Sequence, residues 1–483
     1  MLTHLRHKPV ILASTLFVPL ALAYWPFKID DAYISFVYAK NLVQGHGLTY
    51  NGLVVEGYSN FLWTVMIAPF IALGWDPLVV ARFISLGCAV ATLFLTERLI
   101  RRLNPTVSAL ASGLALLTIA VSVPFTAWTL GGLETALMTL EVALFVYCEL
   151  HADPRLTRWS VIVALACALT RPEGAMLFPI LIAHRLIYRS QPVRQIVRQG
   201  ALFVVPFAAY LLWRYVTYGY WLPNTAFLKL DSSLATLSAA ANWLLAYLQL
   251  RPLLAGLLVM GLAGLVRDRL WADRNWCLVL GVIGAFIAFV LYAGPDWMPH
   301  HRFIVPIIPL LGLLTGRALS LFRHVWLQRA TYILALGGVV LEVVFALTTA
   351  IPIAPRFGDY TDGLIRGGVW IQQNTTPQDT IAVVDAGALA YYSERRTIDI
   401  IGLNDAHIAH APGKSDAAYV LAQCPKVVQL HIEFSPSTGV WPPTQRDHNW
   451  DIFYHPAFQS DYAPYWAGTA DPFFPFLFTR QPD

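Results

Sequence analysis

Charged residues are scarce in this chain. Asp, Glu, Lys and Arg make up 13% of its 483 residues, whereas soluble proteins carry about 25%. Hydrophobic residues reach 57%, and the mean hydropathy is +0.55. These values exclude an ordinary soluble globular protein and predict a chain that crosses a membrane several times.

Basic tracts with interleaved aromatic residues are also missing, although the formal net charge is +4. Nucleic-acid binding is therefore excluded. The five cysteines form no Cys-x-x-Cys pair, and four of them lie in apolar runs. The sequence thus indicates neither a zinc site nor a disulfide framework. Internal repeats and low-complexity tracts are not apparent either.

Apolar runs recur from the N-terminus to about residue 350. Runs of about 17 to 25 residues are typical of transmembrane helices. The stretch 57–74 is apolar too, but we interpret it as a helix in the membrane interface. The N-terminus also fits a cleaved signal peptide ending near Ala23, but we favour a span because the following chain is membrane-spanning as well. We predict about eleven spans, near residues 9–25, 78–99, 106–124, 132–150, 159–170, 174–188, 200–216, 252–266, 276–293, 303–321 and 331–350.

Arginine distinguishes the two sides of the predicted membrane. Basic residues gather in alternate turns, which are therefore cytoplasmic by the positive-inside rule. They are Arg6, Lys8, Arg98, Arg101, Arg102, Arg155, Arg158, Arg185, Arg189, Arg194, Arg198, Arg267, Arg269, Arg274, Arg323 and Arg329. The opposite turns carry acids instead: Asp30, Asp31, Glu56, Glu134, Glu173, Asp231 and Asp296. This pattern predicts a multi-pass protein with a cytoplasmic N-terminus and acidic turns outside.

The C-terminal part differs from the apolar part. Pro352 and Pro355 mark a boundary, so we predict a transmembrane domain at 1–352 and a soluble α/β domain at 353–483. β-Branched runs at 380–384 and 397–401, with a third run at 427–432, predict buried strands. An odd number of crossings would place this domain outside. We expect the tail from Trp441, rich in Pro, Trp and Phe, to pack against the membrane surface.

One external stretch, residues 28–63, carries a dense set of candidate functional residues. It opens with the adjacent carboxylates Asp30 and Asp31. Apolar positions from Tyr33 to Lys40 then recur at helical spacing, which predicts a short helix on the membrane surface. Glycines interrupt the chain before Glu56, Tyr58 and a second aromatic helix containing Trp63. We interpret this stretch as a reaction site.

Paired acids at a membrane boundary fit the transfer of a sugar from a lipid-linked donor. Nucleotide sugars are not available outside the cytoplasm, so an external transferase needs a lipid-phosphate donor. The acceptor hydroxyl then needs a carboxylate base within hydrogen-bonding reach. Alternatively, Asp31 caps the following helix. The two roles are compatible, because one acid can cap the helix while the other reacts.

Other external turns supply candidate binding residues. Arg302 begins a predicted span, where its guanidinium can bind a phosphate in a bidentate way; snorkelling at the bilayer surface is the structural alternative. Asp296, His300 and His301 lie in the same turn, but adjacent histidines point apart and no third ligand spacing is evident, so no metal is predicted. The remaining candidates are Glu134, Arg171, Glu173, Asn224 and Lys229, of which Arg171 and Glu173 can pair with each other.

These residues belong to motifs that resemble a known group, the mycobacterial terminal β-(1→2)-arabinofuranosyltransferase family, which has the GT-C fold. The motifs are Asp-Asp-Ala-Tyr-Ile-Ser at 30–35, Asn-Leu-x-x-Gly-x-Gly-Leu at 41–48, Val-Glu-Gly-Tyr-Ser-Asn-Phe-Leu-Trp at 55–63, Gly-Gly-Leu-Glu-Thr at 131–135, Thr-Arg-Pro-Glu-Gly at 170–174, Trp-Leu-Pro-Asn-Thr at 221–225, Asp-Trp-Met-Pro at 296–299, Asp-Ala-Gly-Ala at 385–388 and Ile-Gly-Leu-Asn-Asp at 401–405. The last two add Asp385 and Asp405 to the candidate binding residues.

The resemblance implies a GT-C helical bundle with a decaprenyl- or undecaprenyl-phosphate sugar donor, D-arabinofuranose as the sugar, and Asp30 with Asp31 at the catalytic centre. A β-linked donor giving a β-linked product would mean net retention, with Asp30 as nucleophile by the logic of retaining glycosidases. An α-linked product would need only a single displacement with Asp30 as base. Arg302, His301 and Lys40 would neutralise the departing phosphate, while Glu56 and Tyr58 would line the sugar site.

The sequence therefore predicts a glycosyltransferase of the bacterial plasma membrane that acts on an envelope glycan acceptor at the external face, without a cofactor. Within enzymes, the alternative is transfer of another sugar, or transfer to lipopolysaccharide or to a protein such as pilin. From another class, the alternative is a transporter of lipid-linked sugars. A transporter should show internal repeats and ionisable residues in mid-span, and neither is clear here.

Overall fold

The computed structural model describes residues 8–151, 153–229, 233–431, 433–435, 439–441, 448–465 and 476–481. The chain divides into two compact units. The helical unit comprises Met1–Phe27, Ala81–Tyr210 and Leu230–Ala354, and the mixed unit comprises Lys28–Val80, Leu211–Lys229 and Pro355–Asp483. Each unit therefore contains segments that are far apart in the sequence.

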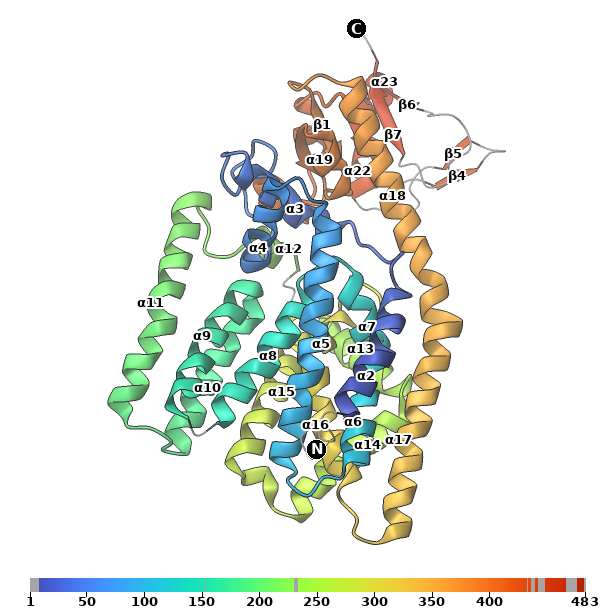
Figure 1. Ribbon diagram of the computed structural model, residues 1–483. Helices are drawn as coiled ribbons and strands as arrows, with labels where there is room; N and C mark the ends of the chain where they lie inside the picture. The colour runs from blue at the N-terminus through green and yellow to red at the C-terminus, as the bar shows by residue number, and fades with distance from the viewer. Residues whose placement is uncertain are drawn as a thin grey trace. The chain divides into compact units, whose positions relative to one another are not determined.

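The helical unit consists of apolar helices joined by short turns (Figure 1). Its helices, two of which continue into the mixed unit, are α2 (Lys8–Leu22), α5 (Pro77–Leu103), α6 (Ala109–Ala120), α7 (Val123–Leu130), α8 (Thr135–Leu150), α9 (Pro154–Thr170), α10 (Leu177–Ile187), α11 (Val193–Tyr218), α13 (Leu234–Gln249), α14 (Pro252–Arg267), α15 (Arg274–Ala293), α16 (Ile308–Leu319) and α17 (Val325–Phe345). Short 3₁₀ segments at Pro172–Met176, Leu270–Ala272 and Arg302–Ile307 precede α10, α15 and α16.

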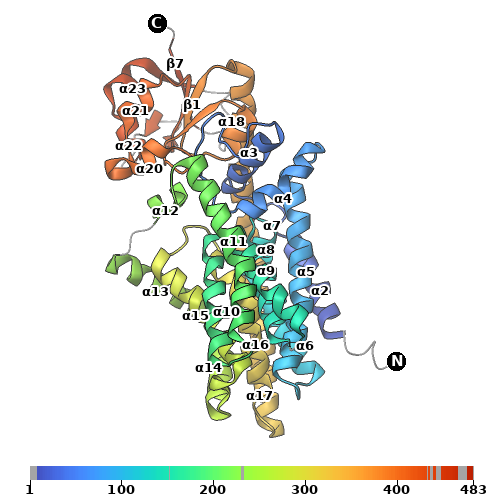
Figure 2. The same cartoon turned by 90° about the vertical axis from the view of Figure 1, so that its left-hand side faces the viewer.

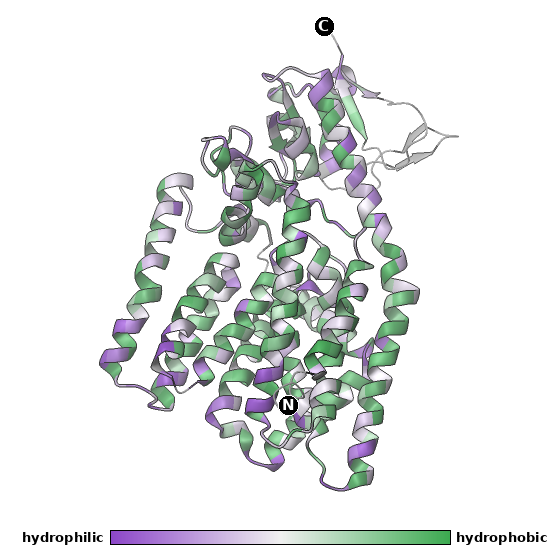
Figure 3. Ribbon diagram, viewed as in Figure 1, coloured by the Kyte–Doolittle hydropathy of each residue, from purple (hydrophilic) through white to green (hydrophobic). Residues whose placement is uncertain are grey.

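Hydrophobic residues cover most of the length of these helices (Figure 3). In the described part of the chain, five helices are long and apolar enough to cross a membrane, and up to seven if each of two bent pairs counts as one span. Every predicted span overlaps a helix, and the chain is a membrane protein. The predicted number of eleven crossings stays a prediction, because several of these helices are shorter than a bilayer requires. Helix α13 was not predicted as a span.

Close contacts between backbones hold the helical unit together. Helix α8 packs against α9, and α14 packs against α16 (Figure 2). A side chain at Gly261 of α14 would lie 2.4 Å from the Leu314 carbonyl oxygen of α16, and one at Gly312 would lie 2.2 Å from Ile119 of α6. Small residues at such crossings allow membrane helices to approach closely.

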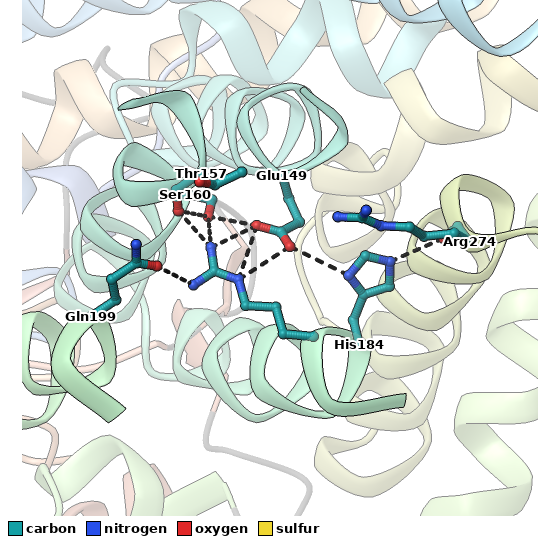
Figure 4. Close-up of polar contacts among 7 residues, drawn as sticks. Glu149, Thr157, Ser160, His184, Gln199 and Arg274 are labelled. Atoms are coloured by element: carbon teal, nitrogen blue, oxygen red, sulfur yellow. Dashed lines mark hydrogen bonds and ion pairs between the residues drawn. The ribbon is translucent and has the colours of Figure 1, made fainter. Parts of the chain in front are cut away.

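A buried ionic network joins four helices of this unit (Figure 4). Glu149 of α8 and Arg185 of α10 are completely buried, and Arg185 Nη2 lies 2.7 Å from Glu149 Oε2. Ser160 of α9 donates to the same carboxylate at 3.0 Å, and Arg185 donates to Gln199 of α11 at 2.7 Å. Removing either Glu149 or Arg185 would leave the other charge buried and unpaired, which costs several kcal/mol. We interpret the network as structural.

The mixed unit combines short helices with a five-stranded sheet. Its helices are α3 (Asp31–Val43), α4 (Phe61–Ala72), α12 (Asn224–Lys229), α18 (Ile351–Asn374), α19 (Ala388–Ser393), α20 (Ala406–His410), α21 (Ala417–Ala422), α22 (His448–Phe453) and α23 (Pro456–Asp461), with a 3₁₀ turn at Pro412–Lys414. The strands of the sheet are β1 (Thr380–Val383), β2 (Arg396–Asp399), β3 (Val427–Gln429), β6 (Tyr462–Tyr465) and β7 (Leu477–Arg480), in the order β2-β1-β3-β7-β6.

The sheet is parallel on one side and antiparallel on the other. β1 pairs in parallel with β2 and β3, whereas β7 pairs antiparallel with β3 and β6. Apolar side chains from the strands, including Ala382, Ile398, Val428 and Phe478, form its core. Strands β4 (Glu433–Ser435) and β5 (Gly439–Trp441) form a separate hairpin. The three predicted strands are confirmed, whereas β6 and β7 were not predicted.

The prolines after Ile351 do not end a helix. Helix α18 begins at Ile351 and continues through Pro352 and Pro355 to Asn374. A π-helical segment, Ala346–Ala350, directly precedes it. Pro352 is the second residue of α18, where a missing N–H donor costs little. Pro355 lies inside the helix, where it removes the hydrogen bond to the Ile351 carbonyl.

Candidate active site

The carboxylate of Asp30 binds the backbone of a segment more than 350 residues away. Its Oδ2 accepts a hydrogen bond from the Gly387 N–H at 2.9 Å, and its Oδ1 accepts one from the Ala388 N–H at 2.7 Å. These N–H groups lie at the start of α19, where a helix favours negative charge. Asp30 therefore caps α19 rather than its own helix, and Asp31 lies within the first turn of α3 instead of at its N-cap.

Gly387 is required by this contact. A Cβ atom at this position would lie 2.1 Å from the Asp30 carbonyl oxygen and 2.6 Å from its Oδ2. Real contacts of a Cβ atom are not this short, so any side chain would displace Asp30. The Asp-Ala-Gly-Ala motif at 385–388 thus contains a glycine because the acidic segment lies directly against it.

Helix α3 of the same stretch lies beside α19 (Figure 1), and two more side chains of the stretch bind the backbone around α19. Tyr50 Oη donates to the Ala386 carbonyl at 2.5 Å, and Asn51 Nδ2 donates to the carbonyls of Ala390 and Arg395 at 2.9 and 3.0 Å. These contacts leave the segment that carries Asp30 little freedom relative to α19.

A second acid, Asp385, lies just before the capped turn. Its Oδ2 accepts hydrogen bonds from Tyr360 Oη at 2.6 Å and from Gln429 Nε2 at 2.9 Å. His431 Nε2 lies 2.7 Å from the same oxygen. Gln429 Oε1, the oxygen of the same side-chain amide, accepts a hydrogen bond from the Asp385 backbone N–H at 3.0 Å. The side chain of Asp385 is thus held from three directions.

Asp385 changes the electrostatic environment of Asp30. Burial and the negative charge of Asp385 raise the pKa of Asp30 well above its usual range, while the hydrogen bonds from Ala388 and Gly387 oppose this shift. A carboxyl with a raised pKa accepts a proton more readily near neutral pH than an ordinary aspartate does. Asp30 therefore has the electrostatic character of a reaction-site residue.

Several other predicted residues of the mixed unit are engaged in ion pairs or in its core. Lys40 pairs with Glu394 and donates to the Tyr391 carbonyl at 3.2 Å. Buried Glu56 accepts two hydrogen bonds from Arg214, at 2.8 and 2.9 Å. Tyr58 is buried with its hydroxyl 3.3 Å from that of Tyr218, and Trp63 is completely buried.

Asn224, Asp405 and Lys229 occupy connecting segments. The Asn224 N–H donates to the Glu56 carbonyl at 3.1 Å, which joins α12 to the stretch 28–63. Asp405 caps α20 through the Ile408 N–H at 3.1 Å and accepts a hydrogen bond from Tyr419 at the same distance. The side chain of Lys229 lies outside the described residues.

In the helical unit, the predicted residues form two buried ion-pair clusters. Arg171 lies between two carboxylates: its Nη1 is 2.5 Å from Glu134 Oε1, and its Nε pairs with Glu173. The Arg171–Glu173 pair is the structural pairing that the sequence predicts. Arg302 Nε lies 2.8 Å from Asp296 Oδ2. Arg302, the guanidinium predicted to meet a phosphate, is thus already paired with a carboxylate.

His301 lies beside Arg302, with its ring 4.7 Å from that of Trp243. Burial and the charge of Arg251 lower its pKa to about 4. The described residues contain no group of three or more His, Cys, Asp or Glu side chains that could hold a metal ion.

Tyr360, Gln429 and His431 were not predicted as site residues. A signal existed for two of them, because the carboxyl ends of parallel strands meet at one edge of a sheet. Asp385 follows β1 at that edge, and Gln429 and His431 lie at the end of the neighbouring β3. Tyr360 had no such signal, since it lies on a helix whose contact with the sheet only the fold reveals.

The chain is similar to known proteins in part of its sequence and in its fold. A family model described as "Domain of unknown function (DUF8728)" matches residues 359–471. The chain has no match among curated proteins. ArnT from Cupriavidus metallidurans bound to undecaprenyl phosphate aligns over 98% of both chains, with a TM-score of 0.62 and 13% identity.

An archaeal protein is similar as well. AglB, the oligosaccharyltransferase from Archaeoglobus fulgidus in complex with an inhibitory peptide and a dolichol-phosphate, aligns over 88% of this chain and 69% of its own, with a TM-score of 0.56 and 13% identity. At these identities the similarity establishes the fold. The predicted fold class is confirmed, because the chain has the GT-C architecture of an apolar helical bundle with a small sheet.

Proposed function

We propose that this chain, which has the fold of the GT-C membrane glycosyltransferases, transfers a sugar from a polyprenyl-phosphate donor to an acceptor hydroxyl. The observation that carries the proposal is the alignment over 98% of both chains with a protein bound to undecaprenyl phosphate. The complex of AglB with a dolichol-phosphate supports the same class of donor. The predicted reacting acid, Asp30, is close enough to Asp385 in the mixed unit for that charge to raise its pKa. A pair of interacting acids is typical of a reaction site, which gives a chemical reason for the proposal.

Asp30 is the reacting carboxylate in this proposal. It is partly buried, and two backbone N–H groups fix its orientation. In a single displacement, a carboxylate takes the proton of the acceptor hydroxyl or stabilises the charge that develops at the anomeric carbon. In a double displacement, it attacks that carbon and forms a glycosyl intermediate. NMR analysis of the product anomer distinguishes the two, since inversion of configuration would remove the nucleophile role.

The donor phosphate requires a cation. Arg302 and Arg171 are paired with acids in the helical unit. In the mixed unit, Arg356 is exposed and lies on α18, four residues before Tyr360. Residues four apart lie on the same face of a helix, so Arg356 lies one turn before Tyr360, which contacts Asp385. Arg356 is thus our candidate for binding the leaving phosphate.

The finer assignments rest on the motifs. D-Arabinofuranose as the sugar and a cell-envelope glycan as the acceptor follow from the resemblance to the arabinofuranosyltransferases. The distribution of arginine supports a cytoplasmic N-terminus with the acidic segments outside, and the bacterial plasma membrane follows from the same resemblance. The proposal needs no metal or other cofactor, because a lipid phosphate is a good leaving group once a cation neutralises it.

The test uses the purified full chain in detergent, a set of polyprenyl-phosphate sugars that includes β-D-arabinofuranose, and alkyl glycosides as acceptors. Asp30→Asn should lower transfer about 100- to 10,000-fold, as expected for loss of an acid–base group, while thermal unfolding shows a folded protein. Asp416→Asn is the matched control, because Asp416 also caps a helix of the mixed unit, α21, through the Tyr419 N–H. Full activity of Asp30→Asn, or no turnover of any donor by the wild type, would contradict the proposal.

A further inference from the structure

His431 has a position in the candidate site that the proposed function does not yet use. Its side chain is 47% exposed, whereas that of its partner Asp385 is 12% exposed. Nε2 of the ring lies 2.7 Å from Asp385 Oδ2 and 3.0 Å from Tyr360 Oη. The histidine thus presents one ring nitrogen to a held carboxylate and part of its surface to the outside.

The contacts of Asp385 determine which ring nitrogen carries the hydrogen. An ionised carboxylate only accepts hydrogen bonds, and Tyr360 and Gln429 already donate to it. At 2.7 Å, Nε2 of His431 must therefore donate as well. In the neutral ring the lone pair then resides on Nδ1, which makes Nδ1 the basic atom.

We propose that His431 is the general base that takes the proton of the acceptor hydroxyl, with Asp385 and Tyr360 as positioning residues. This inference rests on the proposed function and assigns its proton-transfer step. The acceptor O–H proton moves to Nδ1 while the acceptor oxygen forms a bond to the anomeric carbon. The bond from that carbon to its leaving oxygen breaks, and the leaving oxygen keeps the electron pair. The imidazolium, stabilised by Asp385, then loses its proton to water.

The arrangement also gives Asp30 a distinct role. With His431 as base, the carboxylate of Asp30 acts on the anomeric carbon, as nucleophile or as stabiliser of its positive charge. In a single displacement the leaving oxygen is that of the polyprenyl phosphate. In a double displacement it is the carboxylate oxygen of Asp30. His431 accepts the same proton in both cases, so the inference does not depend on the stereochemical outcome.

A second His–Asp pair in the same unit serves as a comparison. His407 Nε2 lies 2.8 Å from Asp416 Oδ2, and the His407 side chain is 49% exposed. Asp416 caps α21 through the Tyr419 N–H, and the His407 ring stacks on Tyr419. Distance and exposure thus match those of His431, but the surroundings are those of a helix cap. His407→Ala is therefore a matched control.

The experiment measures steady-state transfer by the full chain, with whichever polyprenyl-phosphate sugar the wild type turns over. His431→Ala should lower kcat about 100- to 1,000-fold, within the range for loss of a general base, while the KM for the acceptor changes little. Added imidazole should restore part of kcat in His431→Ala and have no effect on His407→Ala. The double variant Asp385→Asn, His431→Ala should have the same kcat as His431→Ala alone, because substitutions of residues that act as a unit do not have additive effects on the rate.

Each outcome decides the matter. The role of His431 would be overturned if His431→Ala kept the wild-type kcat, or if imidazole did not restore the lost activity. The proposed function would still stand in that case, as long as Asp30→Asn is inactive. No turnover by the wild type would overturn both. Should His431→Ala fail to fold, His431→Asn, which keeps a side-chain N–H toward Asp385, takes its place. A kcat of that variant equal to wild type would then refute the inference.

Discussion

Replacing Gly387 by alanine tests the contact on which the candidate site depends. The added methyl group would lie 2.1 Å from the Asp30 carbonyl oxygen and 2.6 Å from Oδ2. The carbonyl oxygen belongs to the backbone, so a side-chain rotation cannot relieve the clash. Either the segment around Asp30 or the turn 385–388 must move by about 1 Å, since Cβ contacts below about 3 Å do not occur.

The cost follows from the hydrogen bonds that this movement breaks. Asp30 accepts two of them, at 2.9 and 2.7 Å. Hydrogen bonds to charged groups contribute about 1.5–3 kcal/mol each, so the free energy that holds Asp30 against α19 should fall by about 3 kcal/mol or more. A loss of about 3 kcal/mol corresponds to about a 100-fold larger population of the open state.

Hydrogen–deuterium exchange measures this population directly. The amides of residues 387–391 should exchange about 100-fold faster in Gly387→Ala than in the wild type, and transfer should fall by a similar factor. Gly284→Ala is the control, because a Cβ atom at Gly284, on helix α15, meets no atom within 4 Å. Unchanged exchange and activity in Gly387→Ala would refute the geometry from which Asp30 is assigned.

Two further predictions concern stability. Arg214→Met leaves Glu56 buried without the guanidinium that binds it at 2.8 Å. The free energy of unfolding should fall by about 3–5 kcal/mol, and Tm should fall with it. Adding Glu56→Gln should restore part of this stability, and an unchanged Tm in the single variant would count against the ion pair. The pKa of His300 and of His301 is lowered to about 4, first by burial and then by the charge of Arg251. Because these folded-state values lie below the unfolded value of about 6.5, the neutral rings contribute stability that is complete above pH 6.5 and is lost as the pH falls toward 4. Thermal unfolding should show this loss, and His301→Phe should reduce the slope; an equally steep slope in that variant would contradict the assignment.

The sequence was most informative where one side-chain property dominates. The apolar runs predicted helices, and the β-branched runs at 380–384 and 397–401 predicted strands that are buried in the sheet. β6 was missed because Pro464 interrupts it, and a proline is tolerated there since β6 is an edge strand. The prolines at 352 and 355 mark the predicted boundary, and the two compact units divide between Ala354 and Pro355, although helix α18 continues through both prolines.

The candidate site was predicted only in part, for a physical reason. Asp30 and Asp385 lie in motifs that stand out in the sequence. Their relation to each other depends on a contact between residues 357 positions apart, for which no local pattern exists. The predicted binding cations Lys40 and Arg302 have acidic partners that likewise become visible only in the folded chain.

The hydrogen bonds between Asp30 and the turn at 387–388 also set an order of events during synthesis. Asp30 leaves the ribosome early, whereas its partners at 387 and 388 are made more than 350 residues later. Until then the acid has no cap, and the carboxylate at 385 that raises its pKa has not been made. A nascent chain that ends before residue 385 therefore already contains the apolar helices α2 to α17 but lacks half of the candidate site.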